Sequence, residues 1–185
     1  MRVVSIMHIV SILSVLLYST LALAFRQHAK RGAETNATLY AYGTNSLDWP
    51  ISYGIDDGLL YIAENPSDES ANLTPVTWDL ASITGECWIA NASFVNGTRA
   101  GSMYIMDHVD YAVGVLPQTR AAYINGTVSG FALFASQLVF NNDTLLQAQF
   151  WARKTDYEDV YALTWTLDDG EPNGKFPVVV KASED

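Results

Sequence analysis

One histidine is the main candidate for chemistry in the chain beyond residue 31. His108 lies in the cluster Asp107-His108-Val109-Asp110-Tyr111, between two runs of strand-like composition. If residues 103–113 form one continuous strand, His108 and Asp110 share a face, about 7 Å apart at Cα. A carboxylate beside an imidazole raises its pKa and orients it, which suits general acid–base catalysis near neutral pH. The alternative is a turn in which the aspartates cap backbone amides and His108 is solvated.

Other kinds of active site fit the sequence less well. No second histidine follows residue 31 to complete a typical metal site. An all-oxygen calcium site could be drawn from Asp56-Asp57 or Asp168-Asp169-Gly170-Glu171, but neither has EF-hand spacing, so we expect no metal ion. A serine hydrolase would need a Gly-x-Ser-x-Gly turn, which is absent, and Cys87 fits a small buried residue better than a reactive thiol. No phosphate-binding glycine loop occurs, so we expect no nucleotide cofactor.

Polar and aromatic residues elsewhere are candidates for ligand binding. In one later segment, apolar residues alternate with Gln147, Gln149, Trp151 and Arg153. This face fits either a solvated outer surface or a concave site that combines an aromatic wall with amide and guanidinium donors. Arg120 is one of only six basic residues after residue 31, and it is suited either to hold an anionic or enolic ligand or to balance nearby carboxylates.

The first 31 residues indicate secretion. Residues 1–24 combine Arg2, an apolar stretch and the small-x-small end Ala22-Leu23-Ala24, the pattern of a cleaved signal peptide. A membrane anchor is disfavoured by polar interruptions in that stretch and by the lack of another apolar run of about 18 residues. Residues 25–31 end in Lys30-Arg31, which predicts a short pro-segment with a dibasic processing site; an ordinary basic tail is the alternative. We expect residues 32–185 to be secreted or held in a vesicular or vacuolar lumen.

Glycosylation motifs agree with that compartment. A cluster of Asn-x-Ser/Thr sequons behind a signal peptide predicts a glycoprotein. The six sequons are at Asn36, Asn72, Asn91, Asn96, Asn125 and Asn142. Cys87 is the only cysteine, so no internal disulfide can form and stability must come from an apolar core.

The charge of the chain excludes some partners. Residues 32–185 carry six basic and twenty acidic side chains, a net charge near −14. Nucleic acid is an implausible partner, because few cations are available to neutralise a phosphate backbone. Binding to anionic lipid is disfavoured for the same reason, and no stable membrane insertion is expected.

Almost every apolar segment after residue 31 has the composition of a strand, rich in Tyr, Trp, Val, Ile and Thr and bounded by Gly, Pro, Asn and Asp. Asn96-Gly97 and Asn125-Gly126 predict two-residue hairpins, and Asn141-Asn142-Asp143 a third, slightly longer one. Thr127–Phe140 and Leu145–Lys154 are predicted as single long strands. We predict an all-β fold, an antiparallel β-sandwich or flattened barrel of about ten strands in one domain.

Several strand-like stretches also resemble a known group. Tyr40-Ala41-Tyr42-Gly43-Thr44-Asn45, Gly58-Leu59-Leu60-Tyr61-Ile62-Ala63, Gln149-Phe150-Trp151-Ala152 and Tyr161-Ala162-Leu163-Thr164-Trp165 resemble small secreted fungal β-sandwich glycoproteins. This group includes the hetero-Diels–Alderases of tropolonic sesquiterpenoid biosynthesis. The resemblance covers most of residues 36–181, and none of its motifs is diagnostic of a reaction.

The resemblance implies a cofactor-free pericyclase of secondary metabolism that joins a tropolone o-quinone methide to a humulene-type alkene. Such a catalyst needs an aromatic-lined cavity that brings small apolar substrates together, with a few polar groups to expel water and polarise a carbonyl. Residue chemistry then suggests His108 with Asp110 as the acid–base pair and Arg120 as the holder of the tropolone oxygens. The predicted substrate-binding residues are Tyr111, Gln149, Trp151 and Trp165.

A function of a different class explains secretion, glycans and acidity equally well. A non-catalytic carbohydrate-binding or cell-wall interaction protein would stack aromatic side chains on sugar rings. Aromatic residues on a flat, solvent-facing sheet would favour that function, whereas a closed apolar cavity would favour the pericyclase. A homodimer is compatible with either function, and a structural or effector role is a further alternative.

Overall fold

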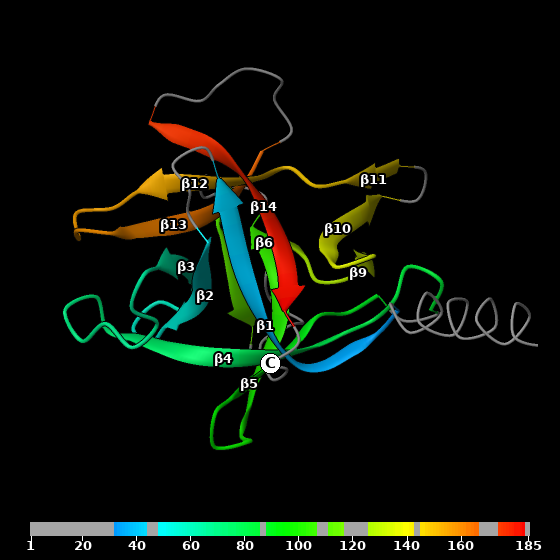
Figure 1. The fold of residues 1–185 in the computed structure, drawn as a ribbon, viewed down its shortest axis with the longest axis horizontal. Helices are drawn as coiled ribbons and strands as arrows, with labels where there is room; N and C mark the ends of the chain where they lie inside the picture. The colour runs from blue at the N-terminus through cyan, green and yellow to red at the C-terminus, as the bar shows by residue number, and fades with distance from the viewer. Residues whose placement is uncertain are drawn as a thin grey trace, which may run out of the picture. The chain divides into compact units, whose positions relative to one another are not determined.

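Every regular element that the computed structural model describes is a β-strand (Figure 1). The described residues are 32–43, 48–85, 88–106, 111–116, 126–142, 145–166 and 174–183, and all lie in one unit, Gly32–Asp185. The strands are β1 (Glu34–Gly43), β2 (Asp48–Gly54), β3 (Leu60–Ala63), β4 (Leu73–Leu80), β5 (Asn91–Phe94), β6 (Arg99–Met106), β7 (Val113–Leu116), β8 (Gly126–Thr127), β9 (Phe131–Phe134), β10 (Gln137–Asn142), β11 (Leu145–Gln147), β12 (Phe150–Lys154), β13 (Val160–Trp165) and β14 (Lys175–Ser183). The predicted all-β, antiparallel single domain is confirmed, with fourteen strands in these ranges rather than about ten.

Six of the strands pair edge to edge in a closed ring. Its order is β1, β2, β3, β13, β12, β14 and back to β1, and each pair is antiparallel. β1 and β14 run side by side, from Thr38 opposite Ser183 to Gly43 opposite Val178 (Figure 1). Closure pairs strand edges that an open sheet would leave exposed to solvent.

A second sheet shares strand β1 with the ring. Near its start β1 also pairs with β4, which continues through β5, β6 and β7, and β8 pairs with β6. β7 then returns to the ring through isolated bridges between Leu59 and Gly114 and between Ala112 and Thr164. The ring and the second sheet therefore share a strand and meet again at β7.

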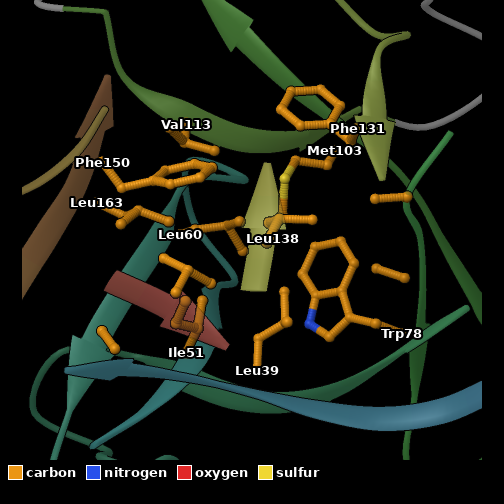
Figure 2. Close-up of a cluster of buried hydrophobic side chains, with 14 of the residues drawn as sticks. Leu39, Ile51, Leu60, Trp78, Met103, Val113, Phe131, Leu138, Phe150 and Leu163 are labelled. Carbon is orange, nitrogen blue, oxygen red and sulfur yellow. The ribbon is translucent and has the colours of Figure 1, made fainter. Parts of the chain in front are cut away.

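The apolar core is built from side chains of many strands. The residues labelled in Figure 2 come from ten different strands, and each is at most 1% exposed. Leu138 lies near the middle, with Trp78 and Phe131 to one side and Phe150 and Leu163 to the other (Figure 2). Because side chains alternate faces along a strand, every second residue can reach this core. Within the described ranges no helix is long and apolar enough to cross a membrane.

Both long predicted strands are interrupted. The segment predicted as one strand over residues 127–140 covers the end of β8, all of β9 and most of β10, with a two-residue reversal at Ala135-Ser136 where Ala135 has φ 57°. The segment over residues 145–154 is divided into β11 and β12, because β11 pairs with β10 and β12 pairs with β14 and β13. The change of partner breaks the strand between them, and Leu146, one of the apolar residues that alternate with the glutamines, is 46% exposed.

The hairpin predictions have different outcomes. A hairpin at Asn96-Gly97 is confirmed, with a three-residue rather than a two-residue loop, since the N–H of Phe94 donates to the carbonyl of Thr98 (2.8 Å). A third hairpin is present, since β10 pairs antiparallel with β11, but Asn141 and Asn142 belong to the paired strand rather than to the predicted turn. The prediction of a turn at Asn125-Gly126 is wrong for Gly126, which pairs with β6 as part of β8; Asn125 lies outside the described residues.

Candidate functional site

The predicted catalytic residues His108, Asp110 and Arg120 lie outside the described part of the chain. The strands on either side of His108 are described: β6 ends at Met106, β7 begins at Val113, and the two are antiparallel. The chain therefore reverses direction between them. The condition of one continuous strand over residues 103–113 is therefore not met, and strand alternation cannot be used to place His108 and Asp110 on a common face.

The start of β7 is held against the end of β13. The backbone N–H of Trp165 donates to the carbonyl of Tyr111 (2.8 Å), and the N–H of Thr166 donates to the carbonyl of Gln149 (3.2 Å). These bonds place three of the four residues predicted to bind substrate on adjoining strand ends. Tyr111 is also the first described residue after His108, so Gln149 and Trp165 lie near the point where the described chain resumes.

The two candidate tryptophans lie on opposite faces of the ring. Trp165 is paired with Phe150, and Trp151 with Thr164. Directly paired residues share a face and neighbours along a strand alternate, so the two indoles point away from each other. Trp165 is 2% exposed and packs edge-on against Phe150 and Phe140, with ring centroids 4.9 Å and 5.5 Å away. Trp165 is thus a core residue and Trp151 is half-buried on the other face; substrate binding by either stays a prediction.

Unpaired polar atoms occur near the same strand ends. The Oε1 atoms of Gln147 and Gln149 are buried, and neither has a hydrogen-bond partner within the described residues. A buried acceptor without a partner costs about 1–3 kcal/mol, and in native proteins such atoms are commonly satisfied by water, an ion or a ligand. Tyr111 is 41% exposed and has φ 51°, a backbone conformation that is uncommon outside glycine. We call Tyr111, Gln147, Gln149, Trp165 and Thr166 the strand-end site.

An open groove lies beside the hairpin that joins β5 to β6. It encloses about 540 Å³ and is lined by Tyr53, Ile55, Thr74, Phe94, Val95 and Asn96. The rings of Tyr53 and Phe94 meet edge-on with centroids 5.5 Å apart, while Ile55 is 54% and Val95 73% exposed. Apolar walls with a few polar groups are typical of ligand sites. No sequence motif predicted this groove; the available signal was the apolar pair Phe94-Val95 at a hairpin tip, where polar residues are usual.

A tyrosine and an aspartate clamp the turn between β2 and β3. The Tyr61 hydroxyl donates to Oδ2 of Asp57 (2.5 Å), and the N–H of Leu59 donates to Oδ1 (2.9 Å). Burial, and then the hydrogen bond and negative charge of Asp57, raise the pKa of Tyr61, although the charge of Arg153 opposes this. Burial and the charge of Asp57 also raise the pKa of Tyr104. Both phenols stay protonated at neutral pH, so the cluster stabilises the turn and is poorly suited to proton transfer.

Two of the predicted glycosylation sites have exposed asparagines, namely Asn36 and Asn96. The N–H of Asn36 donates to Oδ1 of Asp79 (3.2 Å), and Oδ1 of Asn96 accepts from the N–H of Thr98 (2.9 Å). In neither bond does the side-chain nitrogen, the atom to which a glycan is attached, take part. Neither the exposure of these asparagines nor these hydrogen bonds prevents glycosylation.

Two other sequons have asparagines that are half-buried and hydrogen-bonded. Nδ2 of Asn72 donates to Oδ1 of Asp56 (2.8 Å), and Oδ1 of Asn91 accepts from Arg99 (2.6 Å) and Ser102 (2.9 Å). A glycan at Asn72 would have to attach to a nitrogen that already makes a bond. The side chains of Asn125 and Asn142 lie outside the described residues.

Comparison with known proteins identifies no family for this chain. No protein-family model, curated protein or solved structure matches the chain. Among the described side chains, no three from His, Cys, Asp and Glu are close enough to share a metal ion. The resemblance to secreted fungal glycoproteins, and the roles that follow from it, stay predictions. Any functional proposal must therefore rest on the strand-end site and the groove.

Proposed function

We propose that the domain binds a small, largely apolar substrate at the strand-end site. The observation that carries this proposal is the pair of backbone bonds from Trp165 to Tyr111 and from Thr166 to Gln149, which brings separately predicted residues onto adjoining strand ends. The unpaired Oε1 atoms of Gln147 and Gln149 supply acceptors that a hydroxyl-bearing substrate would satisfy.

The finer form of this proposal is a cofactor-free hetero-Diels–Alderase. In that form His108, supported by Asp110, exchanges a proton with the tropolone substrate, and Arg120 holds its oxygens. Tyr111, which is 41% exposed at the strand-end site, shields the reacting pair from water. Holding diene and dienophile together lowers the entropic part of the barrier, so neither a metal nor a nucleotide is required.

The proposal includes a secreted, glycosylated product. The exposed asparagines at Asn36 and Asn96 and the absence of any possible internal disulfide are compatible with it. The test of secretion is expression of the full chain in a yeast secretory host. We expect a glycosylated product in the medium that begins at Gly32 by N-terminal sequencing.

Turnover tests the enzymatic proposal directly. Protein from that host is incubated with a precursor of the tropolone o-quinone methide and a humulene-type alkene, and the adduct is followed by chromatography and mass spectrometry. We expect His108→Ala to slow cyclisation by about 10²–10⁴-fold, as expected for lost acid–base catalysis. Gln149→Leu should weaken substrate binding, while Gln137→Leu, a half-buried glutamine of β10, serves as the matched control. Full rates in both His108→Ala and Arg120→Ala would show the catalytic assignment to be wrong.

Carbohydrate binding is the second candidate function, and the groove is the observation that favours it. Tyr53 and Phe94 present aromatic surface in an open depression, beside Ile55 and Val95. A glycan-array signal that is lost in Phe94→Leu, together with no turnover of the tropolone and humulene-type pair, would replace the enzymatic proposal with this one.

A further inference from the structure

The hairpin between β5 and β6 holds the backbone of the Asn96 sequon in place. The N–H of Gly97 donates to the carbonyl of Phe94 (2.8 Å), and the N–H of Phe94 donates to the carbonyl of Thr98 (2.8 Å). Gly97 has φ +80°, the left-handed conformation that completes a three-residue loop with a bulge. Asn96 is the central residue of this loop, so its backbone is tied down on both sides.

Asn96 lies at the wall of the groove. Its Oδ1 accepts from the N–H of Thr98 (2.9 Å), which fixes the carboxamide plane and leaves Nδ2 as the attachment atom. Asn96 is also one of the residues that line the groove, together with Phe94 and Val95. The first sugar on Nδ2 would therefore begin at the wall of the groove rather than on an unrelated surface.

The groove offers that sugar an apolar face. Val95 is 73% and Ile55 54% exposed, and the ring of Phe94 stands edge-on to Tyr53. Exposed apolar area of this kind contributes about 25 cal/mol per Å² when it is covered. A pyranose ring carries C–H groups on its faces, so it can cover apolar and aromatic side chains while its hydroxyls stay in water.

We propose that the first N-acetylglucosamine attached to Asn96 folds back over Phe94 and Val95 and occupies the groove as an intramolecular ligand. This inference rests on the proposal that the chain is secreted and glycosylated, and it is independent of which substrate the strand-end site binds. The glycan acts as a structural part of the domain and covers the groove, so this inference and the binding of free carbohydrate in the groove exclude one another.

The matched experiment changes the sequon without changing the groove. Thr98→Ser keeps the sequon and Thr98→Ala removes it, and Thr98 does not line the groove. Both full-length variants are made in a yeast secretory host, and occupancy of Asn96 is measured by peptide mass spectrometry. The same pair made in bacteria, where no N-glycan is added, gives the intrinsic cost of alanine at this position. Bacterial expression is reasonable because the chain holds a single cysteine.

We expect glycosylated Thr98→Ser to melt about 2–4 °C above Thr98→Ala, after subtraction of the bacterial baseline, which corresponds to about 1 kcal/mol for a domain of this size. Trimming all glycans to the first sugar should leave the difference intact, because only that sugar reaches the groove. The second exposed sequon is the control: the Thr38→Ser and Thr38→Ala pair changes the Asn36 site, which does not line the groove, and should show no such gap.

Substitutions in the groove complete a double-mutant cycle. In a Val95→Ser background the gap between Thr98→Ser and Thr98→Ala should fall below about 1 °C, since the apolar surface under the sugar is gone. Phe94→Leu provides a second background that keeps an apolar side chain but removes the ring. An unoccupied Asn96, an absent gap, or a gap that persists in both backgrounds would overturn the proposal. Each outcome is independent of the cyclisation assay, so failure here and failure of the enzymatic proposal can be told apart.

Discussion

Gly114 allows β7 to approach the ring, and replacing it by alanine tests that approach. A Cβ at this position would lie 2.8 Å from the backbone oxygen of Gly58 and 2.9 Å from the ring of Tyr104. At the same point the N–H of Val115 donates to that Gly58 oxygen (2.8 Å), and Leu59 bridges to Gly114. Since the clash at Gly58 is with backbone, it cannot be relieved by a change of rotamer.

The expected loss of stability in Gly114→Ala follows from two opposing effects. Overpacking of a tight site costs about 1–3 kcal/mol. Alanine also restricts the unfolded chain at a position without positive φ, which returns about 0.4–1 kcal/mol. The net loss in Gly114→Ala is therefore about 1–2 kcal/mol, which lowers the melting temperature by about 2–8 °C.

Two assays check this expectation: thermal unfolding for the loss of stability, and amide hydrogen exchange for its location. The Val115 amide should exchange faster in Gly114→Ala, relative to other core amides. Gly97→Ala is the control, because Gly97 has φ +80° and no neighbour within 4 Å of its Cβ position. It should lower stability by about 1–2 kcal/mol through backbone strain alone, without a selective effect on Val115. Unchanged stability and unchanged Val115 exchange in Gly114→Ala would refute the close approach of β7 to Gly58.

Two further predictions concern buried polar groups. The pKa of Tyr61 is raised in the folded state, by burial and by the hydrogen bond to Asp57, so its contribution to stability is complete below pH 10 and is lost as the pH rises above 10. Urea unfolding between pH 9 and 12 should show this loss, with a slope of up to about 1.4 kcal/mol per pH unit for one proton. Tyr61→Phe should remove that part of the slope, while Tyr104, whose pKa is also raised, keeps its own part. Ser52 is fully buried and its hydroxyl has no partner within the described residues, so Ser52→Ala should be neutral or stabilising by about 1 kcal/mol in urea unfolding. Thr164, whose hydroxyl donates to the carbonyl of Trp151, is the contrasting case: Thr164→Val should destabilise by about 1 kcal/mol, and equal effects at both positions would contradict the assignment.

The fold class could be predicted because strand character is a local property. In β14, Val178, Val180 and Ala182 are buried while Val179 and Lys181 are exposed, as alternation requires. The reversal between β9 and β10 could not be predicted, since Ala135 takes a left-handed conformation that its side chain does not favour. Tertiary pairing with the neighbouring strands decides that turn.

The closure of the ring also could not be predicted from local sequence patterns. The pairing of β1 with β14 joins the two ends of the domain, and neither strand carries a feature that names its partner. The same holds for the candidate site. Side-chain type suggested Tyr111 and Trp165 as substrate walls, but backbone pairing determines that they are in contact. Side-chain type also did not show that Trp151 and Trp165 lie on opposite faces.

Because β1 pairs with β14, one edge of β1 has no partner during most of the synthesis of the chain. About 135 residues separate Gly43 from its partner Val178. At roughly 5–20 residues per second a ribosome needs about 7–27 s to make them, and until then this edge of β1 has no partner. Unpaired strand edges are where chains join one another, so the nascent protein is most prone to aggregate before its last strand emerges.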